Sequence, residues 1–178
     1  MCIRDSVRAV TRGDGKKGDD VTENVRGIAS LPKIIRGKNI PPLLEIRAEV
    51  YMTRKEFICA NLERQEKGES LWANPRNAAA GSLKLLDSKL SKSRNLQIFC
   101  FAICQGTPRD LNSQYELHLY LQALGFPTVG KSSTALVHNI KEIKQYIERI
   151  GVEREKLPFD IDGIVIKIDL SLIHISEP

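Results

Sequence analysis

The sequence has no apolar run long enough to cross a membrane, for which a helix needs about 20 residues. Its N-terminus lacks the apolar stretch of a secretory signal peptide. It has no internal repeat and no low-complexity tract, which excludes a repeat architecture. We therefore expect an intracellular, cytoplasmic protein with no membrane partner.

Cysteine is also scarce, and the four present are Cys2, Cys59, Cys100 and Cys104. Cys100 and Cys104 would share one side of a strand, but no second Cys or His pair completes a zinc site. In such apolar surroundings cysteine behaves as a small hydrophobic residue. We therefore predict buried, reduced thiols rather than a metal centre.

The length of 178 residues suffices for one domain with its own hydrophobic core. Hydrophobic residues make up 42% of the chain and charged residues 28%, as in folded rather than disordered proteins. The net charge of +5 is a mild excess that fits a polyanionic partner, or solubility alone.

Periodicity predicts a mixed α+β domain. Apolar and polar residues alternate over Leu44–Met52, as in a strand with one buried face. Thr53 begins a capping box, so a helix starts there and should end near Gly68. The other predicted strands are Val7–Thr11, Leu96–Cys104 (buried on both faces) and Asp162–Asp169. One further helix carries Leu117–Leu124, and another is capped by Asn139, carries the isoleucines that follow and should end at Gly151.

The segment Trp72–Lys84 is the most informative part of the chain. Its Asn-Pro step ends one element, because proline moves the preceding residue out of the helical region. Arg76 then begins a helix of small residues, at a position where the helix dipole favours acids. An ordinary Ala-rich helix with a solvated arginine fits this pattern, and so does an anion-binding site.

Three other places carry candidate functional groups. Glu45, Arg47 and Glu49 share one face of a predicted strand, which is typical of a solvated surface. In a cleft, the same groups would hold a divalent cation and a phosphate. Lys167 either reaches solvent, pairs with a neighbouring acid or faces a ligand. Arg12 lies in a Gly-bracketed turn whose backbone N–H groups can bind an anion.

Four segments resemble, in the same order, motifs of bacterial NAD-dependent DNA ligases: Thr11–Arg26, Leu44–Val50, Trp72–Lys84 and Ile161–Lys167. The resemblance implies an adenylation (nucleotidyltransferase) domain with mixed, largely antiparallel sheets and flanking helices. It also implies a parent enzyme of DNA replication and repair. That enzyme would seal nicks between 3′-hydroxyl and 5′-phosphate ends through enzyme–AMP and DNA–AMP intermediates.

By the same resemblance, Glu49, Lys167 and Asp162 have catalytic roles. Glu49 would lie in the nucleotide pocket and help to hold hydrated Mg²⁺ (or Mn²⁺). Lys167 would touch the α-phosphate of the adenylate, and Arg12 would contact the bound NAD or adenylate. Asp162 would support the metal or the nucleophile.

Arg76 and Lys84 resemble the two basic positions that meet phosphates of nicked double-stranded DNA. The family often has arginine in place of Lys84. An ammonium group, which acts as a point charge, therefore replaces a guanidinium group that can donate two parallel hydrogen bonds there. The resemblance implies a monomeric parent that associates with the nucleoid.

The family's Lys-x-Asp-Gly motif, whose lysine forms the lysyl–AMP, does not occur in this sequence. Residues 1–6 and 170–178 resemble translated sequencing-adapter read-through, which leaves 7–169 as a partial adenylation domain of a longer protein. Any Zn²⁺ would belong to a parent region outside this window. We expect an active parent enzyme and an inactive chain. The alternative is a non-catalytic basic module that binds nucleotide or DNA with the same fold.

Overall fold

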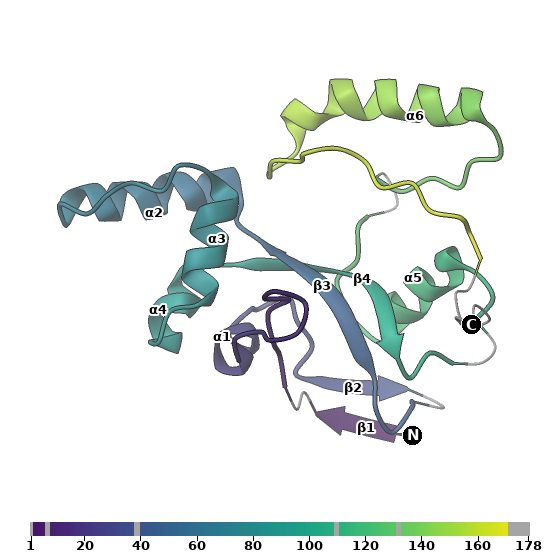
Figure 1. The fold of residues 1–178 in the computed structure, drawn as a ribbon, viewed down its shortest axis with the longest axis horizontal. Helices are drawn as coiled ribbons and strands as arrows, with labels where there is room; N and C mark the ends of the chain where they lie inside the picture. Colours follow the sequence, from purple (N-terminus) through teal and green to yellow (C-terminus); the bar gives the residue numbers. More distant parts are fainter. Residues whose placement is uncertain (1, 6–7, 38–39, 109–110, 131–132, 171–178) are drawn as a thin grey trace.

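The computed structural model describes residues 2–5, 8–37, 40–108, 111–130 and 133–170. Figure 1 shows helices on either side of strands arranged as two antiparallel pairs, which confirms the predicted α+β class. In chain order the elements are β1 (Cys2–Asp5), α1 (Thr22–Arg26), β2 (Ile34–Gly37), β3 (Glu45–Tyr51), α2 (Arg54–Glu66), α3 (Pro75–Leu83), α4 (Ser88–Ser93), β4 (Gln97–Gln105), α5 (Gln114–Ala123), α6 (Ile140–Glu153) and the 3₁₀ turn η2 (Arg154–Lys156). No helix in the described part of the chain has the length and apolar character of a membrane span.

β3 and β4 form the central antiparallel pair, in which Ala48 lies opposite Cys100 and Glu49 opposite Phe99. The apolar positions of β3 face inward and its charged positions face solvent, as the alternation predicted. The register shifts between Arg47 and Ala48, because β4 carries one extra residue, Phe101, at that point. This irregularity is a β-bulge, a feature that bends a strand and re-aims a side chain.

Helix starts follow their capping residues closely. The Thr53 hydroxyl accepts a hydrogen bond from the Glu56 amide at 3.2 Å, which confirms the predicted start of α2. Asn139 caps α6 in the same way. The prediction that α6 stops at Gly151 is wrong, since the helix continues to Glu153. Glycine weakens a helix but does not end one unless the chain turns there.

The largest buried cluster joins helices α2 and α3 to the sheet, through Ile28, Met52, Ala60, Ala78, Ala79, Leu96 and Ile98. A second cluster places α5 on the same sheet, with Leu117 and Leu121 against Cys100. Cys100 is buried, and burial raises the pKa of its thiol to about 12. Cys59 and Cys104 are exposed, so the prediction of buried thiols holds for Cys100 and is wrong for Cys104.

Two predicted strands are absent from the described residues. Residues 8–11 contribute a single bridge, between Val10 and Asp20, because the chain turns back on itself at once. Residues 162–169 are extended but have no ladder partner, and Ile166 and Ile168 are 61% and 78% exposed. A strand is defined by a hydrogen-bonded neighbour, which an alternating pattern alone does not supply.

The expectation for β4 needs a smaller correction. One face of the strand is buried, at Ile98 and Cys100, while the residues between and after them are only partly buried or exposed. At the N-terminal end, Cys2–Asp5 pair as β1 with β2 and so join the fold through their backbone, although we expected residues 1–6 to lie outside the domain. Residues 171–178, the larger part of the other expected tail, lie outside the described residues.

Candidate nucleotide and nucleic-acid site

Arg76 lies in the first turn of α3. The Asn74 side chain caps this helix by accepting from the Asn77 amide at 2.8 Å, and Pro75 occupies the first helical position. The first turn contains no acid, so the unfavourable position of Arg76 needs an anion from elsewhere. The Asp162 carboxylate supplies it, with Oδ2 3.2 Å from Nη1. The structure thus joins two of the predicted site residues, and both side chains are largely exposed.

Lys84 stands at the other end of α3, as its C-cap. Its Nζ lies 2.7 Å from Oδ2 of Asp19, and both side chains are more than half exposed. Asp19 belongs to the turn that carries Arg12. A cation at the C-terminal end of a helix is favoured by the helix dipole. The two ends of α3 therefore each present a cation that is balanced by a carboxylate from a distant part of the chain.

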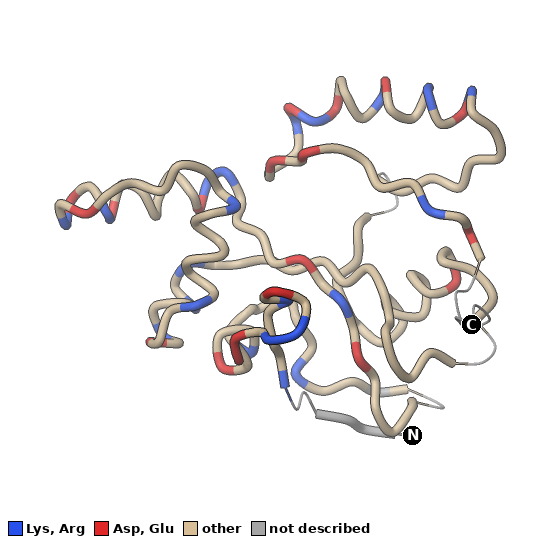
Figure 2. The backbone as a smooth tube through the Cα atoms, viewed as in Figure 1, with Lys and Arg blue, Asp and Glu red and all other residues tan. Residues whose placement is uncertain are grey.

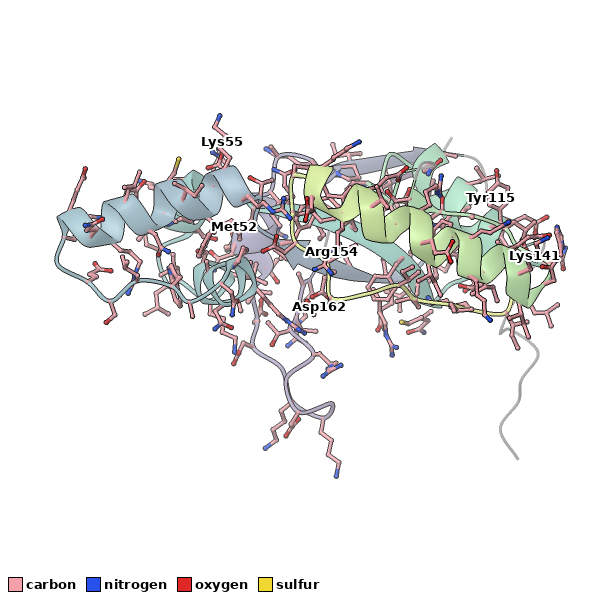
Figure 3. The ribbon with its side chains drawn as sticks, turned by 90° about the horizontal axis from the view of Figure 1, so that it is seen from above. Met52, Lys55, Tyr115, Lys141, Arg154 and Asp162 are labelled. Carbon is pink, nitrogen blue, oxygen red and sulfur yellow. The ribbon has the colours of Figure 1, made fainter. Side chains whose placement is uncertain are left out.

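The turn between Thr11 and Asp19 projects from the body of the molecule, as Figure 3 shows. Two hydrogen bonds join its two arms. The Thr11 amide donates to the Asp19 carbonyl, and the Asp19 amide donates to the Thr11 hydroxyl, both at 2.9 Å. At the tip, the amides of Lys17 and Lys16 donate to Asp14 and lower the pKa of its carboxyl group. Arg12 is exposed there, and its guanidinium has no partner among the described residues.

Glu49 lies on the outward face of β3 beside Arg47 and Glu45, all three exposed. Among the described residues its carboxylate makes no ion pair or hydrogen bond, and no group of three or more His, Cys, Asp or Glu side chains could hold a metal ion. Tyr51 and Phe99 stack on this face at 4.5 Å between ring centroids, and Phe159 meets both rings edge-on. The pKa of Tyr51 is raised by burial.

Lys167 lies against the sheet at the bulge. Its Nζ is 5.4 Å from the centroid of the Phe101 ring, within the range of a cation–π contact. It is also close enough to His118 on α5 to lower the pKa of that imidazole, although burial is the larger cause. The sequence alone does not identify Phe101 as a neighbour of Lys167, because its position at the bulge depends on the register of β3 and β4.

The segment that carries Asp162 and Lys167 is fastened at both ends. Arg54 at the start of α2 binds Asp160 at 2.7 Å and the Glu155 carbonyl at 2.8 Å. At the other end, the Asp169 carboxylate accepts from the Tyr115 amide at 2.9 Å. In the view of Figure 3, Arg154 and Asp162 lie toward the middle of the molecule, between α2 on one side and α6 on the other. Lys167 is thus positioned by side-chain contacts along the segment rather than by a strand.

Helix α3 therefore connects two of the predicted site segments, the turn with Arg12 and the segment with Asp162 and Lys167. Figure 2 shows acidic and basic positions interspersed along these segments and β3. No ion pair or hydrogen bond links Glu49 to Arg12 or to Lys167 in the described part of the chain, so Glu49 is not joined to them directly.

Comparison with known proteins supports the resemblance found in the sequence. The sequence model of the NAD-dependent DNA ligase adenylation domain matches residues 5–174. Proteins named DNA ligase from Protochlamydia amoebophila, Nitrobacter winogradskyi and Bdellovibrio bacteriovorus are 44%, 43% and 43% identical over 91%, 93% and 92% of this chain. The chain spans 24%, 23% and 24% of those relatives' own lengths. The chain therefore belongs to the family of NAD-dependent DNA ligase adenylation domains.

Proposed function

We propose that this chain is the nucleotide-binding part of an enzyme that uses NAD to seal nicks in double-stranded DNA. In that reaction a lysine attacks the α-phosphorus of NAD, nicotinamide mononucleotide leaves, and AMP passes from the lysine to the 5′-phosphate. The 3′-hydroxyl then displaces AMP. The sequence contains no Lys-x-Asp-Gly, so the roles assigned to this chain are binding and charge stabilisation. The relatives are named DNA ligases, which favours this function over a non-catalytic module.

The observation that carries the proposal is the position of α3. Arg76 and Lys84 lie at its two ends, exposed to solvent, and each contacts an acid of a segment that carries a predicted nucleotide-binding residue. A DNA phosphate can replace the carboxylate at an exposed lysine or arginine, because such ion pairs are weak in water. We assign Arg76 and Lys84 to the nicked duplex, which places DNA beside the nucleotide residues.

Arg12, Glu49 and Lys167 are assigned to NAD and the adenylate, and Asp162 to catalytic support. Phosphoryl transfer depends mainly on positioned positive charge, which Arg12 and Lys167 would supply. The flat ring of Phe101, beside Lys167, would offer a stacking surface to a base. Mg²⁺ (or Mn²⁺) commonly keeps several waters and binds one or two carboxylates together with substrate phosphates. The carboxylate of Glu49, which has no ion-pair or hydrogen-bond partner among the described residues, fits that mode of binding: it would hold the hydrated cation, and the cation would stabilise the phosphate charge.

A chimera tests the proposal. Residues 8–169 would replace the matching segment of the Protochlamydia amoebophila DNA ligase, and sealing of a nicked duplex with NAD would be followed on gels. Transfer of labelled adenylate to the protein would be measured separately. We expect the chimera to form the adduct and seal nicks. Lys167→Ala should reduce adduct formation by about 100-fold or more, because it removes charge from the reacting phosphate.

Arg76→Ala is the matched variant for the DNA steps. It should form the adduct at close to the unsubstituted rate and seal nicks slowly. Equal loss of adduct formation in both variants would show that the division into nucleotide and DNA residues is wrong. A folded chimera that forms no adduct would contradict the proposed function.

A further inference from the structure

Asn24 is a buried polar side chain that lies within the Thr11–Arg26 segment but has no role assigned to it in the proposed reaction. It lies in α1, directly after the turn that carries Arg12 and Asp19, and only 8% of it is exposed. Its single amide nitrogen donates two hydrogen bonds across a sequence separation of about sixty residues. The acceptors are the carbonyl oxygens of Leu83 at 2.6 Å and of Leu85 at 2.8 Å.

The residue between those two acceptors is Lys84. The last carbonyls of a helix have no intrahelical partner and need one from elsewhere. The Leu83 carbonyl belongs to the peptide unit that precedes Lys84, and the Leu85 carbonyl belongs to the peptide unit that follows Leu85, so one amide group holds the backbone on both sides of Lys84. The backbone from which the Lys84 side chain leaves is thereby held in place, which restricts the region that its ammonium group can reach.

A second contact ties the same two segments together. The ammonium group of Lys84 meets Asp19 at 2.7 Å, five residues before Asn24 in the chain. The backbone on both sides of Lys84 is thus held by Asn24 in α1, and its side chain is held by Asp19 at the end of the Arg12 turn. We propose that Asn24 is a positioning residue that aims Lys84 at a DNA phosphate. The inference rests on the proposed function, since it takes Lys84 as a DNA contact.

The test measures binding of the 178-residue chain to a nicked duplex over a series of salt concentrations. Each phosphate contact contributes about 0.9 to the slope of log affinity against log salt. Lys84→Ala should lower the slope by about that amount. Asn24→Ala and Asn24→Leu, which keeps the branched shape of the side chain, should lower it by at least half as much. Combining Asn24→Leu with Lys84→Ala should lower it no further than Lys84→Ala alone.

Asn61 offers a matched control. It too is a partly buried asparagine that holds backbone, accepting from the Trp72 amide at 2.8 Å and donating to the Trp72 carbonyl at 3.1 Å. Asn61→Ala should lower the melting temperature but leave the salt slope unchanged. A slope lowered equally in Asn61→Ala would reduce the role of Asn24 to general stability and overturn the inference.

The possible outcomes distinguish a failure of this inference from a failure of the proposed function on which it rests. If Lys84→Ala leaves the slope unchanged, Lys84 does not contact DNA, and both the assignment and the inference are overturned. If Lys84→Ala lowers the slope but the folded Asn24 variants do not, only the inference is overturned. Circular dichroism of each variant establishes that it is folded, and Asn24→Leu fills the buried site should Asn24→Ala fail to fold.

Discussion

The charge of Lys167 acts on His118 although the two residues belong to different segments. Burial is the main cause of the lowered pKa of His118, and the positive charge of Lys167 adds to it. We predict that Lys167→Ala raises the pKa of His118 toward its ordinary value, because one of the two causes is removed. An NMR titration of the imidazole measures this directly. Lys89→Ala, an exposed lysine on α4, should leave the His118 pKa unchanged.

The same shift gives the stability of the protein a pH dependence of known sign. The unfolded chain binds a proton at His118 near pH 6.5, the ordinary pKa of an imidazole, and the folded chain binds it only at lower pH. The contribution of neutral His118 to the free energy of unfolding is therefore fully present above about pH 6.5, and it is lost as the pH falls through the pKa of the folded state. Urea unfolding at neutral and mildly acidic pH should show this loss, and His118→Gln should reduce it.

At the scale of elements, local signals were sufficient wherever one segment determines its own structure. β3 followed from alternation, and the starts of α2 and α6 followed from Thr53 and Asn139. Local signals failed where the structure of a segment depends on the segment that it pairs with. Residues 162–169 alternate like a strand but form no β-ladder, and Phe101 lies at a bulge that exists only in the paired sheet.

The candidate site residues were found by motif, whereas their contacts with Asp19, Phe101 and His118 depend on the fold.

Two helical glycines differ in what surrounds them. A Cβ on Gly81 of α3 would lie 2.2 Å from the indole of Trp72, whereas a Cβ on Gly151 of α6 would meet nothing within 4 Å. We predict that Gly81→Ala destabilises the fold by about 1–3 kcal/mol through overpacking. Gly151→Ala should stabilise it by about 0.5–1 kcal/mol, because alanine is the better helix former. Denaturant midpoints of the two variants should move in opposite directions, and equal shifts would contradict the close packing on α3.

For the whole molecule, Arg54 attaches the start of the C-terminal segment to α2. It binds Asp160 and the Glu155 carbonyl, and its amide donates to the Pro158 carbonyl at 2.9 Å. We predict that Arg54→Ala makes residues 157–169 several-fold more sensitive to limited proteolysis. The global stability should change little, because the ion pair is exposed. Lys55→Ala, one residue along α2, is the control; equal sensitivity of both variants would show that Arg54 does not hold the segment.

Trp72 is the only tryptophan in the sequence. Its indole lies against Gly81, between the two cations of α3, with the Arg64 guanidinium 4.7 Å above the ring. Light absorbed selectively by tryptophan is therefore emitted from one place, beside the C-terminal half of α3, the helix that carries Arg76 and Lys84. The fluorescence of the unlabelled protein is an optical report on that helix, and its quenching by added DNA would be read without attaching a dye.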